Sequence, residues 1–162
     1  MPEVKKVGIS DYQIAQAPDS LQTLGLGSCV AVFIYDKHKK IGGLSHIMLP
    51  NSHLFKGRAE IKVEKFADLA LPKMVTELKE NYGCTRLVAK IAGGANMFSF
   101  NQGAQTQNIG ERNVIAVQTA LKDLKIPLLA SHVGGTMGRS FFANLEDLTV
   151  TVKMVNREII EL

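Results

Sequence analysis

Two apolar, β-rich stretches joined by a short polar segment constrain the fold of this chain more than any other feature. The first stretch covers residues 29–35 (Cys-Val-Ala-Val-Phe-Ile-Tyr), and the second covers residues 40–49. Only residues 36–39 (Asp-Lys-His-Lys) lie between them, which is typical of a β-hairpin. We therefore expect two antiparallel strands that pair with each other.

The length of this loop predicts the register of the hairpin. If residues 36–39 form the loop, Tyr35 faces Lys40 and the numbers of paired residues sum to 75. Cys29 then lies opposite His46, with Cβ atoms about 4.5–5.5 Å apart, a separation that suits a thiolate–imidazolium pair. The loop lacks the Asn-Gly or Asp-Gly pair of the tightest turns, so its sequence alone does not fix the register.

Other segments are predicted as strands because apolar and β-branched residues alternate or cluster between turn signals. These segments are residues 6–16, 21–24, 86–92, 127–133 and 148–155. The first of them contains one or two edge strands around a Ser-Asp turn. We expect a polar loop at 51–60, a glycine- and amide-rich loop from 93 to 108, and a flexible glycine-rich turn at 134–138.

Two helical segments are predicted as well. Apolar residues recur at helical spacing over residues 61–78, where Pro72 either kinks one helix or begins a second one. Gly83 is typical of the end of a helix. The next helix is expected to begin after Asn108, because Asn108 and Glu111 have the spacing of an N-cap and its reciprocal acceptor.

The order of these elements is strands, helix, strand, helix, strands, which is not a regular βαβ repeat. We therefore expect an α+β fold, an α/β sandwich of mixed, largely antiparallel sheets with two or three helices packed outside. A chain of 162 residues is long enough for a single domain, spanning residues 1–162, with its own core.

Composition excludes several classes of function. No apolar run approaches the roughly 20 residues of a membrane span, and the N-terminus lacks the apolar centre of a signal peptide, so a cytoplasmic location without membrane insertion is expected. The net charge of +4 is modest, and no aromatic residues interleave with the basic cluster at 37–40. These features argue against nucleic acid as a partner.

Cys29 is the candidate nucleophile. It follows Gly25 and Gly27, which leave room for a substrate to approach and permit a bend that aims backbone N–H groups at one point. Ser28 is a rival nucleophile, but a thiol needs less activation than a hydroxyl. The alternative is that Cys29 is a small buried hydrophobic residue at the start of a strand.

His46 is the candidate base for that thiol, although a histidine in an apolar strand is more often structural. Thr23 lies on the preceding strand, where its hydroxyl could accept a hydrogen bond from the second imidazole nitrogen and set the tautomer. A strand threonine commonly has no such role. The other cysteine, Cys84, has no basic partner in the sequence around it and is expected to be inert.

Metal and nucleotide sites are not supported. Cys29, His46, His53 and His132 could supply metal ligands, but no CxxC, HExxH or HxxxH spacing is present. The glycines before Cys29 lack the third glycine of a dinucleotide fingerprint and lead into a strand, and no GxxxxGK[ST] pattern occurs. We expect no metal and no cofactor.

Motifs over nearly the whole chain resemble CheD, the chemoreceptor glutamine deamidase family of bacterial and archaeal chemotaxis. The matching segments are residues 23–30 (Thr-Leu-Gly-Leu-Gly-Ser-Cys-Val), 42–50 (Gly-Gly-Leu-Ser-His-Ile-Met-Leu-Pro), 66–68, 90–98, 109–113 and 134–139. The sequence departs from the family at 148–150 (Leu-Thr-Val), where the family tends to have a Thr-Gly step.

The resemblance implies a cysteine hydrolase that converts glutamines of methyl-accepting chemoreceptors to glutamates. By its motifs, the nucleophile falls on Cys29, the general base on His46 and the orienting hydroxyl on Thr23. It also implies a fold similar to the catalytic domain of cytotoxic-necrotizing-factor toxins, and the phosphatase CheC as a partner. The alternative is a non-catalytic binding module that regulates CheC.

Overall fold

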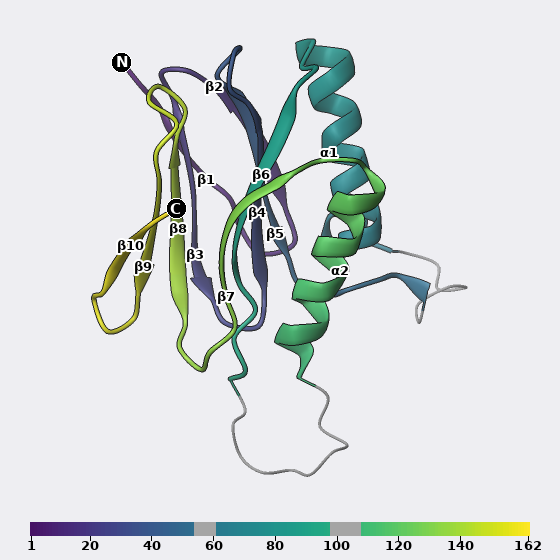
Figure 1. Cartoon of the computed structure of the whole chain (residues 1–162), viewed down its shortest axis with the longest axis vertical. Coiled ribbons are helices and arrows are strands. Elements are labelled where there is room, and N and C mark those ends of the chain that lie inside the picture. The colour runs from purple at the N-terminus through teal and green to yellow at the C-terminus, as the bar shows by residue number, and fades with distance from the viewer. Residues whose placement is uncertain (54–60, 98–107) are drawn as a thin grey trace.

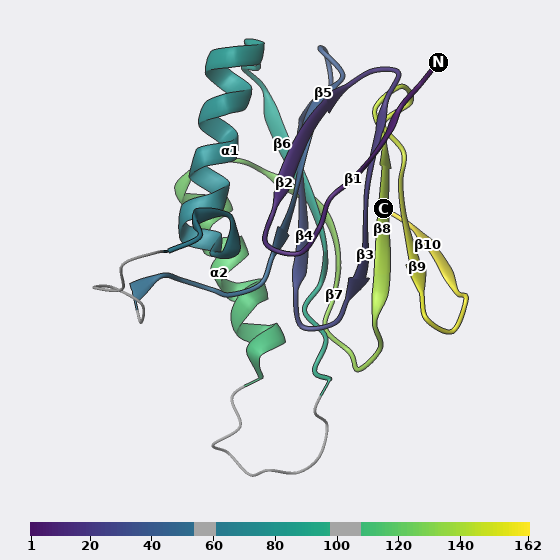
Figure 2. The ribbon, with the colours of Figure 1, turned by 180° about the vertical axis from the view of Figure 1, so that it is seen from behind.

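The computed structural model describes residues 1–53, 61–97 and 108–162, so most of the loops expected at 51–60 and 93–108 lie outside the described residues. In the described part, two five-stranded sheets and two α-helices form three layers (Figures 1 and 2). The first sheet has the order β1 (Val4–Lys6), β3 (Ser20–Leu26), β8 (Arg139–Asn144), β9 (Val150–Met154), β10 (Ile159–Glu161). The second has the order β2 (Tyr12–Gln16), β5 (Ile41–Ile47), β4 (Val30–Asp36), β6 (Leu87–Gly93), β7 (Leu128–Val133).

The expected fold class is confirmed. Pairing is parallel only between β1 and β3 and between β6 and β7 in the described sheets, and antiparallel elsewhere. The helices α1 (Ala67–Tyr82) and α2 (Ile109–Asp123) both cover the outer face of the second sheet (Figure 1). The first sheet covers its inner face, so the molecule has one core between the sheets and another beneath the helices.

Strand β4 lies in the middle of the second sheet and is buried on both faces. Val30, Val32 and Ile34 belong to the core under the helices, whereas Ala31 and Phe33 belong to the core between the sheets. This double burial explains why the sequence of β4 is almost continuously apolar instead of alternating.

The β4–β5 hairpin forms as predicted, but the predicted register is wrong by two positions. Ala31 pairs with His46 and Asp36 pairs with Ile41, so paired numbers sum to 77. The strand extends to Asp36 because its carboxylate is held there by the backbone N–H groups of His38 (2.9 Å) and Lys39 (3.1 Å). A two-residue shift keeps every side chain on the face that the prediction gave it.

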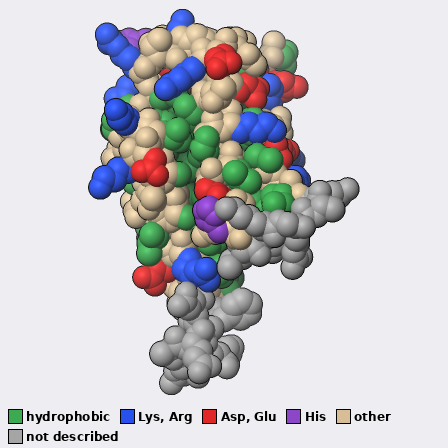
Figure 3. Space-filling model, turned by 90° about the vertical axis from the view of Figure 1, so that its right-hand side faces the viewer, with side chains coloured by type: hydrophobic (Ala, Val, Ile, Leu, Met, Phe, Trp, Pro, Cys, Tyr) green, Lys and Arg blue, Asp and Glu red, His purple; other side chains and the backbone are tan. Residues whose placement is uncertain are grey.

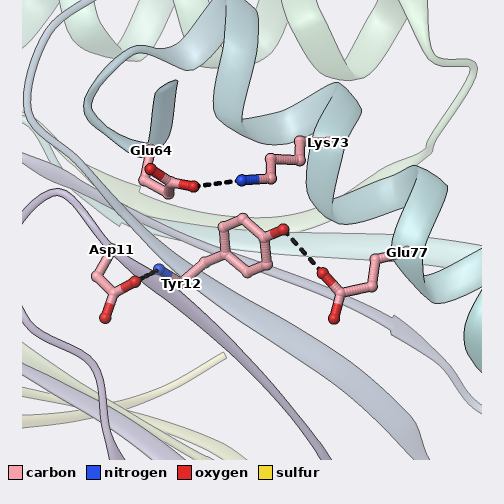
Figure 4. Close-up of polar contacts among 5 residues, drawn as sticks. All are labelled: Asp11, Tyr12, Glu64, Lys73 and Glu77. Carbon is pink, nitrogen blue, oxygen red and sulfur yellow. Dashed lines mark hydrogen bonds and ion pairs between the residues drawn. The ribbon is translucent and has the colours of Figure 1, made fainter. Parts of the chain in front are cut away.

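Helix α1 begins later than predicted, since a separate 3₁₀ turn η2 (Val63–Lys65) precedes it. It continues through Pro72 as one helix and ends at Gly83, whose φ of 69° is left-handed. Two polar contacts fasten α1 to its neighbours (Figure 4): the Tyr12 hydroxyl of β2 donates to Glu77 (2.8 Å), and Lys73 pairs with Glu64 of η2 (2.6 Å).

Helix α2 begins as predicted, with the Asn108 side chain accepting from the Glu111 N–H (3.1 Å). Two strands of the first sheet, β8 and β10, were not predicted, and β1 overlaps the predicted segment 6–16 only at Lys6. Strand β8 alternates clearly, but its first inward position holds Arg139, a residue that is rarely buried. A buried arginine at that position hides the period-2 pattern.

Candidate active site

Cys29 lies in the short connection, residues 27–29, that leads from β3 of the first sheet to β4 of the second. Its side chain is partly buried and packs against the core between the sheets. The proposed nucleophile therefore stands at the mouth of the inter-sheet layer, neither fully buried nor on an open surface.

The carbonyls of this connection all point into the protein. Gly27 O accepts from the Ala95 N–H (2.8 Å), Cys29 O from the Gly94 N–H (2.8 Å), and Ser28 O from the Asn113 side chain (2.9 Å). Among the described residues, none accepts a hydrogen bond from the N–H groups of Gly27, Ser28 or Cys29. With its carbonyls anchored, the segment keeps these donors available to a ligand.

Glycines allow the neighbouring backbone to approach this closely. Gly93 has a φ of 121°, and a Cβ built there would come within 2.2 Å of the Cys29 carbonyl oxygen. Gly25 has a φ of 69° and lies in the irregularity between Thr23 and Leu26, where β3 loses its register with β8. That irregularity bends the chain just before the nucleophile.

His46 and Thr23 meet across the gap between the sheets. Thr23 Oγ1 lies 2.7 Å from His46 Nδ1 and 2.6 Å from the Val7 carbonyl oxygen, and both side chains are buried. The hydroxyl has one proton, and the Val7 carbonyl can only accept, so Thr23 donates to Val7 and accepts from His46 Nδ1–H. This assignment leaves the lone pair on His46 Nε2, which has no hydrogen-bond partner in the described part of the chain.

The environment favours the uncharged forms of the thiol and the imidazole. Burial lowers the pKa of His46 to about 4, because the charged ring would lose its hydration. Burial likewise raises the pKa of the Cys29 thiol. The resting site therefore holds a thiol and a neutral base, and not the thiolate–imidazolium pair that the sequence suggested.

The three predicted catalytic residues thus lie in one layer of the molecule. Thr23 and His46 are in direct contact, and Ala31, two residues after Cys29, is the strand partner of His46. No hydrogen bond joins the Cys29 thiol to His46 Nε2 within the described residues. Such contacts are often loose in a free enzyme and tighten only when substrate binds.

Asn113 is a site residue to which the sequence analysis gave no role. It projects from α2, is fully buried, and donates to Ser28 O (2.9 Å) and to Met48 O (3.0 Å). One side-chain amide therefore joins the nucleophile's segment to the residues that follow His46. The available signal was a polar residue beside Val114 and Val117 on the apolar stripe of the helix.

The other candidates lie apart from this site. Cys84 is 2% exposed, and burial raises its pKa. His132 is bonded to Arg139, with 2.9 Å between its Nδ1 and the guanidinium. Across residues 1–53, 61–97 and 108–162, no three His, Cys, Asp or Glu side chains are grouped so as to hold a metal ion, and no helix is long and apolar enough to cross a membrane.

Comparison with known proteins places the chain in a family. Residues 48–154 match the family model CheD, described as CheD chemotactic sensory transduction. A probable chemoreceptor glutamine deamidase CheD of Clostridium botulinum (strain Eklund 17B / Type B) is 44% identical over 97% of this chain and 96% of its own. The chemoreceptor glutamine deamidase CheD of Halalkalibacterium halodurans is 44% identical over 97% of each chain.

The chain belongs to the CheD family. The family model begins after Thr23, Cys29 and His46, whereas the relatives align over nearly the full length. A solved structure, the hypothetical protein YfiH of Bacillus licheniformis, is 14% identical with a TM-score of 0.44, over 75% of this chain and 49% of that one. This weaker likeness carries no argument about the fold or the function.

Proposed function

We propose that this protein is a chemoreceptor glutamine deamidase, which hydrolyses glutamine side chains of methyl-accepting chemoreceptors to glutamates with Cys29 as the nucleophile. Its relatives are named for this activity. The observation that carries the proposal is the Thr23–His46 contact, since it directs the basic nitrogen of His46 away from Thr23 and leaves it unbonded among the described residues.

In the first half of the reaction, Cys29 Sγ attacks the side-chain amide carbon of the glutamine. His46 Nε2 takes the thiol proton as the S–C bond forms, so the charge develops only during the attack. The imidazolium that results is stabilised by Thr23, which accepts from Nδ1–H. The proton then passes from Nε2 to the amide nitrogen, the C–N bond breaks, and ammonia leaves behind a thioester.

In the second half, water replaces ammonia. His46 Nε2 removes a proton from the water as its oxygen attacks the thioester carbonyl. The C–S bond breaks, the proton returns to the sulfur, and a glutamate side chain is released. The reaction uses no redox step and no co-reactant besides water. The neutral resting site suits this role because His46 must accept a proton at each half-reaction.

The oxyanion of each tetrahedral intermediate is assigned to the backbone N–H groups of Ser28 and Cys29. Gly25 leaves open space for the substrate, whereas Gly27 is covered by the Met97 side chain. The two N–H donors are unbonded within the described residues, and the carbonyls of their segment are anchored. Losing one donor of this kind costs about 10²–10³ in rate in other hydrolases.

Four finer statements belong to the same proposal. Residues 1–162 form one deamidase domain, which works in the cytoplasm, where the modified receptor helices lie. The phosphatase CheC is a binding partner, as the family resemblance implies. No cofactor is needed. The competing hypothesis is a non-catalytic module that regulates CheC, but the polarised Thr23–His46 pair is a costly buried arrangement for a protein that only binds.

The decisive experiment incubates the protein with a receptor cytoplasmic fragment and measures ammonia release and the roughly one-dalton Gln-to-Glu mass shift. Cys29→Ala and His46→Ala are expected to lose both signals while retaining the wild-type circular dichroism spectrum. Cys84→Ala is the matched control, because it removes the other thiol and should remain active. An active Cys29→Ala protein would contradict the proposal.

A further inference from the structure

A second feature of the nucleophile's segment is the groove beside it. The backbone of Gly25, Leu26 and Gly27 forms one wall of a cavity of about 400 Å³. The rest of its lining comes from β8, β9 and the residues that flank these strands, including Arg139, Phe142, Lys153 and Val155. We call this cavity the flank groove. It runs beside the segment that leads directly into Cys29.

The flank groove presents apolar surface. Its lining includes two large hydrophobic side chains that are unusually open to solvent, Met97 at 48% and Val155 at 68% exposure. Met97 Cγ lies 3.1 Å from where a Cβ of Gly27 would stand, so the side chain rests against the segment before the nucleophile. Exposed apolar side chains that gather beside a reactive site are typical of a contact surface for another molecule.

The charge of the flank groove is one-sided. Arg139 and Lys153 line it, and its described lining contains no aspartate or glutamate. The guanidinium of Arg139 is buried and bonds to the carbonyls of His132, Gly134 and Met137 and to the His132 ring, and no carboxylate pairs with it in the described part of the chain. Lys153 Nζ lies 5.2 Å from the centre of the Phe142 ring, at the solvent side. Of the two cations, the exposed Lys153 is the one that can attract a negatively charged ligand.

We propose that the flank groove receives the receptor segment next to the target glutamine and prefers an apolar side chain accompanied by an acidic one. The inference rests on the proposed function and adds a substrate preference to it. Continuity argues for this occupant, because a glutamine at Cys29 places its neighbouring residues along Gly25–Gly27. Complementarity argues for its chemistry, since exposed methionine and valine lie beside the solvent-facing Lys153, which no carboxylate pairs with among the described residues.

A second groove, larger than the flank groove, is the natural rival. A cavity of about 500 Å³ lies between α1 and α2, on the helix-bearing face shown in Figure 3. Its lining carries Asp68 and Asp123 as well as Arg112, so its charge is mixed. The second sheet separates it from the layer that contains Thr23 and His46. Its described lining includes none of residues 25–29, although Ile115 is 54% exposed there.

The test compares steady-state deamidation of a receptor fragment by Val155→Asp, Lys153→Glu and Ile115→Asp. The first two are expected to raise KM about tenfold, equivalent to about 1.4 kcal/mol of binding, with kcat unchanged. Ile115→Asp changes another exposed apolar residue, in the rival groove, and is expected to keep the wild-type KM. Thermal melts verify folding, and Lys153→Glu alone decides the matter if Val155→Asp does not fold.

A charge exchange sharpens the test. A receptor fragment whose acidic residues beside the modified glutamine are changed to lysine should have a raised KM with the wild-type protein. The Lys153→Glu protein should have a lower KM than the wild type for this altered fragment. If Val155→Asp and Lys153→Glu both keep the wild-type KM for the receptor fragment, the inference is overturned. This holds even if the two variants bind a different protein more weakly. Failure of the proposed function is distinct, because it appears as an active Cys29→Ala protein.

Discussion

The Thr23 hydroxyl on one sheet and the His46 imidazole on the other are joined by a 2.7 Å hydrogen bond that closes the core between the sheets. The same hydroxyl donates to the Val7 carbonyl at 2.6 Å, so the three groups form a directed chain. The direction of this chain fixes the histidine tautomer. Packing of the two sheets and the chemistry of the base are therefore coupled through a single hydroxyl.

Replacing Thr23 with valine should lower kcat by at least about tenfold. This loss is a part of the total rate acceleration of about 10²–10⁴ that a general base contributes. Valine fills nearly the same volume but offers no acceptor to His46 Nδ1–H, so the reactive tautomer and the imidazolium both lose support. Thr23→Ser keeps the hydroxyl and should restore most of kcat. Steady-state kinetics on a receptor fragment measure both variants, and equal rates for valine and serine would show that the hydroxyl has no orienting role.

The low pKa of His46 predicts a loss of stability in mild acid. Because the folded-state pKa is about 4 and that of an unfolded histidine about 6.5, the unfolded chain binds the extra proton between these values. Stability is fully present above about pH 6.5 and falls as the pH drops toward 4, by up to roughly 3 kcal/mol. Urea unfolding at pH 7 and pH 5 should show a larger drop for the wild type than for His46→Gln. Parallel losses would assign the effect to other groups.

Alkylation of Cys29 should report a neutral thiol and not a preformed ion pair. Burial raises its pKa, so the iodoacetamide rate should keep rising with pH above neutrality instead of forming a plateau across the neutral range. Cys29 should still react far faster than Cys84, but the 2% exposure of Cys84 is enough to explain that contrast. The informative control is alkylation of Cys29 in the His46→Ala variant. If the wild-type alkylation rate forms a plateau across neutral pH and the variant lacks that plateau, Cys29 and His46 form an ion pair and the prediction is wrong.

Asn113 should position the nucleophile without touching the substrate. Asn113→Ala leaves the Ser28 and Met48 carbonyls without their donors, which should cost about 2–3 kcal/mol of unfolding free energy. It should also lower kcat by more than about tenfold, with KM unchanged, because small displacements of a nucleophile are expensive. Val117→Ala, one turn along the same buried face of α2, is the control: it should lose stability and keep its kcat per folded molecule.

Gly93→Ala should displace the nucleophile's segment. A Cβ at this position would lie 2.2 Å from the Cys29 carbonyl oxygen, on a residue whose φ of 121° disfavours any side chain. We expect a loss of about 3 kcal/mol or more and little residual deamidation. Gly8→Ala meets no atom within 4 Å and should change stability by less than about 0.5 kcal/mol. Thermal melts and activity assays of the two variants measure these effects. A Gly93→Ala protein with wild-type stability and activity would contradict this expectation.

Much of the fold was readable from the sequence because it depends on local patterns. The hairpin around residues 36–40, the Asn108 cap and the Gly83 helix end all follow from short stretches whose hydrogen bonds are made within a few residues. The separation of helices from strands follows from the spacing of apolar residues in the same way. Such features need no knowledge of the distant chain.

The register of that hairpin was not readable locally. The carboxylate of Asp36 also accepts from the Thr85 N–H (3.1 Å), a contact 49 residues away that extends β4 by one residue. Strand β8 was hidden for a similar reason, because the guanidinium of buried Arg139 is bonded to carbonyls of β7 and of the turn that follows it. In both cases a polar residue, Asp36 or Arg139, occupies a strand position at which an apolar residue would have indicated the strand.

The sequence by itself determined that a cysteine after two glycines and a histidine on a neighbouring strand stand on the same face of a hairpin, since a strand's period of two survives a two-residue shift. Only the tertiary structure decided which imidazole nitrogen is basic, that both groups rest uncharged, and that Asn113 holds their two segments together. Those properties depend on burial and on partners from other elements, and neither is encoded in local spacing.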